Sequence, residues 1–208
     1  MKQLFIYITT LLVFCGIFYN FWRTEWKYLI PTPIPQNYQE IQSGTQISLD
    51  TTVFKTNKPI FLHFFSPDCP CSKYNIEYLQ QLVAKNNQQV NFYAILFAED
   101  TVGARQYFQE KYNLKIPVII KNGNLIAASC GVYSTPQAAI IGNNLTLFFR
   151  GNYNKSRYCT DKQTNFAEIA LSNLLNNKMC PDFGEAATRA YGCELPDNYY
   201  ETLPKDTR

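Results

Sequence analysis

A run of apolar residues that leads directly into a cysteine-containing turn is the feature that most limits how this chain can fold. Residues 59–65 read Pro-Ile-Phe-Leu-His-Phe-Phe, which is typical of a strand buried on both faces. Cys69 and Pro70 follow, and apolar residues such as Ile76 and Leu79 then recur at helical spacing. Proline is tolerated in the first turn of a helix. The pattern therefore predicts a buried strand, a turn and a helix that begins at Cys69.

This position favours thiol chemistry at Cys69. The unpaired N–H groups and the dipole at the start of a helix stabilise a thiolate. A thiolate is the form of cysteine that attacks disulfides and binds soft metal ions. We therefore interpret Cys69 as a redox nucleophile rather than a structural thiol at the end of a strand.

The first part of the chain resembles a membrane segment rather than part of a globular fold. Residues 4–22 are apolar and uncharged, and about 20 such residues span a bilayer as a helix. Trp22 and Trp26 suit the aromatic belt at a membrane surface. Because no small-residue cleavage site follows, we favour an uncleaved anchor over a signal peptide. The expected organisation is a transmembrane anchor at 1–23 and a proline-rich linker at 24–44.

The rest of the chain is long enough for one domain with its own core. Helices are predicted to begin near residues 70, 101 and 164, and strands at 59–65, 90–97, 116–120, 137–141 and 145–149. Strands that alternate with helices predict parallel pairing, and a final hairpin adds an antiparallel edge. The expected fold class is α/β, a mixed sheet flanked by helices, in a domain at 45–178 with a tail at 179–208.

Six cysteines lie beyond the anchor, and an even number in a membrane-tethered chain favours an oxidising compartment. Cys180 and Cys193 flank a stretch of the tail with few apolar residues, and a disulfide between them would contribute about 3 kcal/mol. We interpret this pair as structural and expect Cys130 and Cys159 as a possible second bridge. A bond from Cys71 to Cys130 or Cys159 is the alternative, and six reduced thiols in a cytosolic domain are another.

Composition gives no indication of several other functions. The net charge is only +3 and no basic run occurs, so nothing points to nucleic-acid binding. His63 is the only histidine and lies within a predicted buried strand, where we expect a core residue. We predict no metal site and no cofactor.

Two motifs resemble the thioredoxin-like superfamily, in particular its membrane-anchored redoxins. Residues 64–72 resemble the active-site turn, and residues 131–136 resemble the cis-proline loop. The 67 residues from Cys69 to Pro136 match the redoxin branch, which carries an extra strand and helix in this interval. The resemblance implies a thioredoxin-like sheet, with Cys69 as the attacking thiol. It also implies that the loop of Thr135 and Pro136 presents backbone groups to a substrate disulfide.

The active-site turn departs from the Cys-x-x-Cys pattern of that superfamily, because it reads Cys69-Pro70-Cys71-Ser72. Ser72 holds the position of the resolving thiol, and Cys71 lies between. Residues i and i+2 of a helix point about 200° apart, so a bridge from Cys69 to Cys71 requires the first turn to open. We nevertheless expect Cys71 to resolve mixed disulfides, in which case Cys71→Ser would trap them.

The resemblance implies a membrane-anchored thiol–disulfide oxidoreductase that acts on protein thiols and disulfides. The expected location is a bacterial inner membrane, with the domain facing the periplasm or the cell exterior. A thiol peroxidase is the alternative enzyme. Ser66 lies three residues before Cys69, as in peroxiredoxins, but the upstream proline of that family is Leu62 here. The non-enzyme alternative is a copper-delivery or binding module on the same fold.

Overall fold

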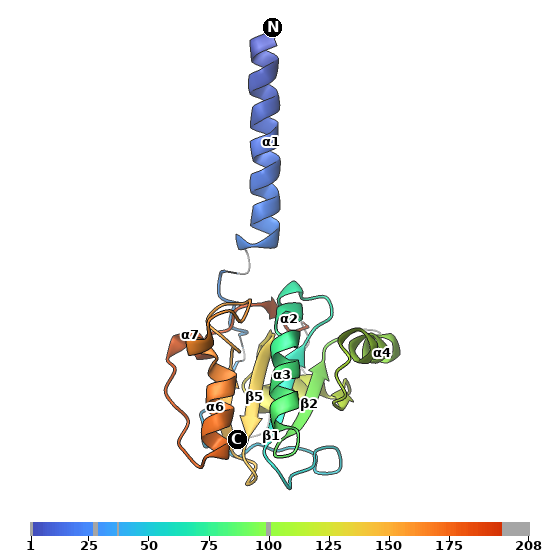
Figure 1. Cartoon of the computed structure of the whole chain (residues 1–208), viewed down its shortest axis with the longest axis vertical. Helices are drawn as coiled ribbons and strands as arrows, with labels where there is room; N and C mark the ends of the chain where they lie inside the picture. Colours follow the sequence, from blue (N-terminus) through green and yellow to red (C-terminus); the bar gives the residue numbers. More distant parts are fainter. Residues whose placement is uncertain (1, 27–28, 37, 99–100, 197–208) are drawn as a thin grey trace. The chain divides into compact units, whose positions relative to one another are not determined.

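The chain forms two compact units, Met1–Pro31 and Thr32–Arg208, in a computed structural model that describes residues 2–26, 29–36, 38–98 and 101–196. The first unit contains helix α1 (Lys2–Thr24), none of whose residues is buried (Figure 1). This helix is long and apolar enough to cross a membrane. The rings of Trp22 and Trp26 stack just beyond the apolar run, with centroids 5.6 Å apart.

The second unit is built on a five-stranded sheet with the order β3-β2-β1-β5-β6. Its strands are β1 (Ile60–Phe65), β2 (Asn91–Leu96), β3 (Val118–Ile119), β5 (Gln137–Ile141) and β6 (Leu147–Gly151). Strands β1, β2 and β3 run parallel, whereas β5 is antiparallel to both β1 and β6. The predicted mixed sheet with an antiparallel hairpin is confirmed, although β3 is shorter than expected.

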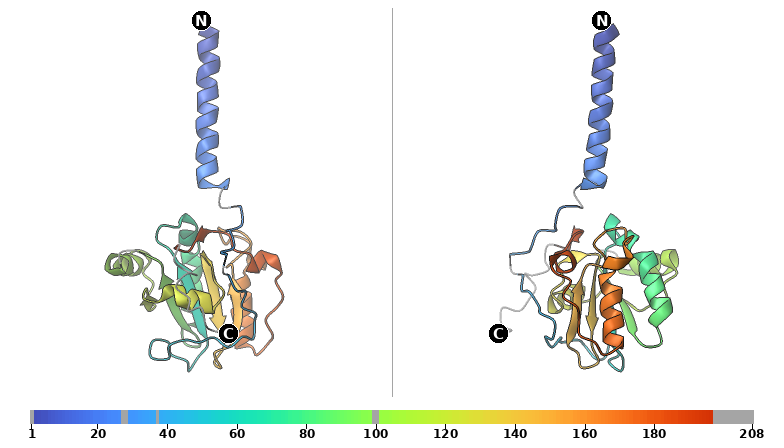
Figure 2. Two further views of the ribbon diagram at one scale, coloured as in Figure 1. Left: turned by 180° about the vertical axis from the view of Figure 1, so that it is seen from behind. Right: turned by 60° about the vertical axis from the view of Figure 1, so that its left-hand side comes forward.

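Helices cover both faces of this sheet. The helices are α2 (Pro70–Tyr74), α3 (Ile76–Asn86), α4 (Thr101–Tyr112), α5 (Gly123–Ser129), α6 (Phe166–Leu175) and α7 (Glu185–Thr188), with a 3-10 turn at Lys162–Thr164. Alternate residues of β1 face opposite sides, as a strand requires. Phe61 and Phe65 pack with α3 and α6 on one face, and Leu62 and Phe64 pack with α5 on the other. Figure 2 shows helices on both sides of the sheet.

Two features of this fold were not predicted from the sequence. Helix α5 had not been assigned from periodicity, although the resemblance implied an extra strand and helix, and β3 and α5 lie in that interval. The second difference is a separate two-stranded sheet, in which β4 (Ser134–Thr135) pairs antiparallel with β7 (Cys193–Glu194). The tail therefore returns to the loop that precedes β5.

The tail is packed tightly against the domain. Ala187 and Ala190 are completely buried, and the Asn152 N–H donates to the carbonyl of Ala187 at 2.8 Å. A Cβ built at Gly151 would collide with that same carbonyl oxygen, so the backbones approach as closely as glycine allows. Residues 32–44, expected as linker, also belong to this unit: Thr32 is buried and its N–H donates to Ala190.

Candidate active site around Cys69

The predicted passage from a buried strand through a turn into a helix is confirmed. All six residues of β1 are buried, because the strand lies in the centre of the sheet. Cys69 has an extended backbone (φ −86°, ψ 113°) and is the residue before α2, which opens with Pro70. The Ser72 N–H donates to the Cys69 carbonyl at 3.1 Å and closes the first turn. Cys69 is therefore fixed between the turn that follows the central strand and the start of α2.

The cis-proline loop lies directly against this cysteine. The peptide bond between Thr135 and Pro136 is cis, and the carbonyl oxygen of Thr135 is 3.4 Å from Sγ of Cys69. Strand β5, which follows the loop, pairs antiparallel with β1, the strand that leads to Cys69. The sheet thus brings together the three predicted site residues Cys69, Thr135 and Pro136.

Cys69 is disulfide-bonded to Cys193, with the two Cα atoms 5.8 Å apart and a sequence separation of 124. The expected bridge between Cys180 and Cys193 is therefore absent, and Cys180 is a free thiol. The physical reason is the β4–β7 pairing, which places Cys193 opposite Thr135 and hence beside Cys69. The sequence reasoning missed Cys193 as a site residue. The available signal was Ser72, since a serine at the resolving position leaves that task to a cysteine elsewhere.

The second expected bridge, between Cys130 and Cys159, is also not formed. Cys130 is buried on the face of the sheet that α5 covers, whereas Cys159 packs on the opposite face with α3 and α6. The thiol of Cys159 donates to Asn75 Oδ1 at 2.8 Å. Because the sheet separates these two cysteines, no disulfide can join them. Burial raises the pKa of both thiols to about 12.

Cys71 and Ser72 are both buried within α2. Ser72 Oγ accepts a hydrogen bond from the Ser66 N–H at 3.4 Å, which ties the helix to the active-site turn. Cys71 lines a small cavity of about 30 Å³ together with Pro136 and Tyr191. For Cys71 to resolve a mixed disulfide, as expected from the sequence, a thiol buried in the first turn of α2 would have to reach that disulfide.

His63 lies in the core, as expected from its position in β1. No part of its ring is exposed, and its Nδ1 is 2.6 Å from the hydroxyl of Tyr153. Burial lowers the pKa of the imidazole to about 3. His63 is consequently neutral in the folded domain at neutral pH. Among the described residues, no group of three or more His, Cys, Asp or Glu side chains gathers into a metal site.

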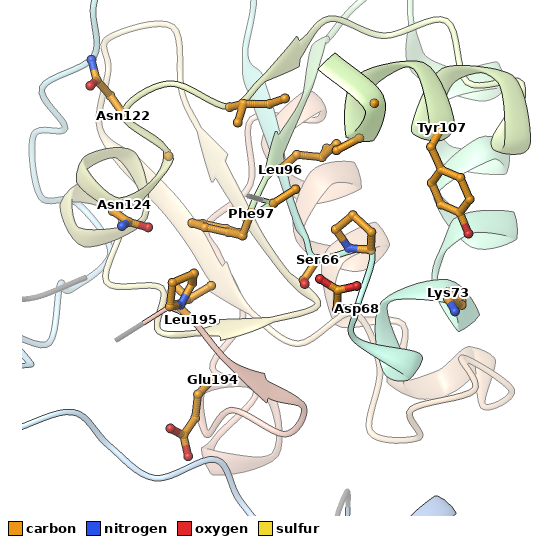
Figure 3. Close-up of a pocket in the computed structure, with 17 residues that line it drawn as sticks. Ser66, Asp68, Lys73, Leu96, Phe97, Tyr107, Asn122, Asn124, Glu194 and Leu195 are labelled. Atoms are coloured by element: carbon orange, nitrogen blue, oxygen red, sulfur yellow. The ribbon is translucent and has the colours of Figure 1, made fainter. Parts of the chain in front are cut away.

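An open cavity of about 950 Å³ lies beside the active-site turn (Figure 3). Ser66 and Asp68 of the turn line it, together with Tyr107 of α4 and Asn124 of α5. Glu194 and Leu195 of the tail also line it. The tail therefore forms part of the wall of the cavity beside the turn of Ser66 and Asp68.

A comparison with known protein families shows which family the chain belongs to. A family model described as "Domain of unknown function (DUF6436)" matches residues 38–194. The chain belongs to the DUF6436 family. The matched range runs through β7, so the tail as far as Glu194 is part of this family's domain.

Two curated relatives of this DUF6436 protein are named thiol-disulfide oxidoreductase ResA. The one from Bacillus thuringiensis subsp. konkukian is 29% identical over 146 residues, which cover 67% of this chain and 82% of the relative. One from Bacillus cereus is 27% identical over the same shares. The expected membership of the thioredoxin-like superfamily, with its thiol–disulfide oxidoreductases, is confirmed.

Solved structures agree on the fold. A hypothetical protein from Sinorhizobium meliloti 1021 superposes with a TM-score of 0.62 at 19% identity, covering 76% of this chain and 96% of that chain. An uncharacterized conserved protein from Geobacillus kaustophilus gives 0.60 at 16% identity, covering 85% and 100%. At these identities the likeness concerns the architecture alone.

Proposed function

We propose that this protein is a membrane-anchored thiol–disulfide oxidoreductase that exchanges disulfides with protein substrates through Cys69. The observation that carries the proposal is the disulfide at Cys69, with the carbonyl of the cis-proline loop 3.4 Å from the same sulfur. The curated relatives named thiol-disulfide oxidoreductase support the reaction class.

The exchange begins when the reduced Cys69 thiolate attacks one sulfur of a substrate disulfide. The substrate S–S bond breaks, and its second sulfur leaves as a thiolate and takes up a proton. The first sulfur stays bound to Cys69 in a mixed disulfide. The backbone of Ser134 and Thr135, which already pairs with a strand in this structure, would hold the substrate segment alongside.

We propose the location on two grounds. Helix α1 has the length and composition of a membrane span, and it would hold the domain at the outer side of a bacterial inner membrane. A disulfide between Cys69 and Cys193 also suits the periplasm or the cell exterior, since cytosolic thiols are kept reduced.

Exchange by Cys69 is tested with the reduced full-length protein in detergent and insulin as the disulfide substrate. Cys69→Ser should lower the rate of insulin reduction to the uncatalysed level, because the sulfur of Cys69 is the one that contacts the Thr135 carbonyl. The matched control is Cys180→Ser, which removes a half-buried thiol outside the site and should keep the full rate. Full activity of Cys69→Ser would refute the proposal. Oxidation of Cys69 by hydrogen peroxide far faster than that of free cysteine would favour the peroxidase alternative.

A further inference from the structure

Strand β7 presents Cys193 to Cys69 through backbone pairing with the cis-proline loop. Thr135 pairs with Cys193 and Ser134 pairs with Glu194. The Ser134 hydroxyl also donates to the Cys193 carbonyl at 3.0 Å. Cys193 is thus aligned opposite the residue whose carbonyl touches the sulfur of Cys69.

The residue before Cys193 fits this loop only as glycine. Gly192 has a φ of +153°, and a Cβ built there would collide with the carbonyl oxygen of Thr135. A side chain at this position would have to push the tail away from β4. The close approach therefore depends on the sequence Gly192-Cys193.

Contacts on both sides fix this short strand while leaving it near the surface. Before it, the Ala190 N–H donates to the Tyr133 hydroxyl at 3.1 Å, and beyond it Leu195 is buried. Gly192 and Cys193 themselves are only half-buried, and Glu194 is exposed. Such a strand can leave β4 and return without opening the sheet.

We infer that Cys193 is the resolving cysteine of this protein and that residues 192–194 occupy the place of the substrate strand on β4 in the oxidised state. The inference rests on the proposed function, because it assigns the second step of that exchange. Since β4 pairs with one strand on this side, the tail and a substrate segment exclude one another. Cys69 is accordingly only 1% exposed while the tail is bound.

The second step begins from the mixed disulfide between Cys69 and the substrate. The tail returns to β4, and the Cys193 thiolate attacks Sγ of Cys69. The bond between Cys69 and the substrate sulfur breaks, and the substrate leaves as its second thiol after taking up a proton. Two electrons have then passed from the Cys69 and Cys193 thiols to the substrate disulfide. A protein dithiol would return the pair to its reduced form by the reverse exchange.

The test compares three variants of the full-length protein after reduction and removal of the reductant. Each is mixed with insulin, quenched with acid and analysed by mass spectrometry without reduction. Cys193→Ser should accumulate a mixed disulfide between Cys69 and an insulin chain. Cys180→Ser and Cys71→Ser should release their insulin chain. Trapping by Cys71→Ser, with release by Cys193→Ser, would overturn the inference and assign resolution to Cys71. Release by all three variants would also overturn it, in favour of an external thiol.

A second variant keeps every cysteine. Gly192→Ala should slow release from the mixed disulfide by on the order of a hundredfold, because Cys193 is then displaced from its attacking position. The first step, formation of the mixed disulfide, should keep its rate. An unchanged release rate would contradict the role of the β4–β7 pairing. Failure of Cys69 to form any mixed disulfide, in every variant, would instead refute the proposed function itself.

Discussion

His63 lies in the middle of β1, where the neighbouring strands place Ala94 and Ala138 beside it. Only the hydroxyl of Tyr153 approaches its ring as a described hydrogen-bond partner. Burial lowers its pKa to about 3, from a value near 6.5 in an unfolded chain. Folding therefore excludes a proton that the unfolded chain would bind in mildly acidic solution.

The pH dependence of stability follows from this one side chain. Between about pH 6.5 and pH 3 the unfolded state binds more protons, so the free energy of unfolding should fall as the pH falls. We expect a loss of about 2 kcal/mol between pH 8 and pH 5, measured by urea unfolding at both values. The control His63→Gln should lose clearly less over the same interval. An equal loss in both proteins would show that His63 is not the cause.

Burial also raises the pKa of the thiols outside the active-site pair. It raises the pKa of Cys130 and Cys159 to about 12 and that of Cys180 to about 11. These three thiols are protonated at neutral pH and hence weak nucleophiles. Cys69, by contrast, is joined to the tail by its disulfide and is only 1% exposed.

At the scale of elements, the tail behaves as part of the domain rather than as an appendage. The Arg150 side chain is buried and donates both to the Thr188 carbonyl and to Glu40, each at 3.1 Å. It thereby joins β6, the tail and the segment around Glu40. Glu40 is largely exposed, but the guanidinium of Arg150 is buried. Loss of both acceptors would leave this buried charge unpaired, so these three segments stabilise one another.

The backbone of β6 lies very close to the backbone of the tail at Gly151. Gly151→Ala should lower the stability by about 2 kcal/mol, because its Cβ collides with the carbonyl of Ala187 and α7 must shift. The disulfide between Cys69 and Cys193 should also form in a smaller fraction of molecules, as measured by mass spectrometry without reduction.

Gly184→Ala is the matched control for this change. Gly184 also has a positive φ, of 64°, but no heavy atom lies within 4 Å of a Cβ built there. The Gly184→Ala variant should therefore lose only the stability that the unfavourable backbone conformation costs. It should keep the disulfide between Cys69 and Cys193. If both variants lose the disulfide equally, strain in the backbone rather than contact with the tail is the cause.

In the whole molecule, the apolar helix and the disulfide-bonded domain both bear on which side of a membrane the domain lies. Helix α1 and the domain are separate compact units, and the disulfide joins Cys69 to Cys193 within the domain. Disulfides persist outside the cytoplasm. The helix and the disulfide are both consistent with the proposed orientation, in which the domain lies outside.

This orientation can be measured with reporter fusions in a bacterial host. Alkaline phosphatase fused after Arg208 should be active, because that enzyme needs an oxidising compartment for its own disulfides. β-Galactosidase at the same position should be inactive. The reverse pattern would place the domain in the cytoplasm and remove the basis for a stable disulfide between Cys69 and Cys193.

The central strand, the turn at Cys69, the helix after it and the hairpin of β5 and β6 can all be predicted from the sequence. These are decided by patterns within a short window, where the period of the apolar residues distinguishes strands from helices. Its two motifs also identified Cys69, Thr135 and Pro136 as neighbours, through the resemblance to a known fold. Helix α5 was not found because its seven residues are too few to show a helical period.

The bonding partner of Cys69 depends on long-range packing. Closing the long loop to Cys193, rather than the short one from Cys180, costs only about 2 kcal/mol more, because loop entropy grows slowly with length. Burial of Ala187, Ala190 and Leu195 and the β4–β7 pairing can outweigh that difference. Those contacts join residues far apart in the chain, which no local pattern encodes. The partner of the active-site thiol was therefore determined by the path of the tail across the folded domain.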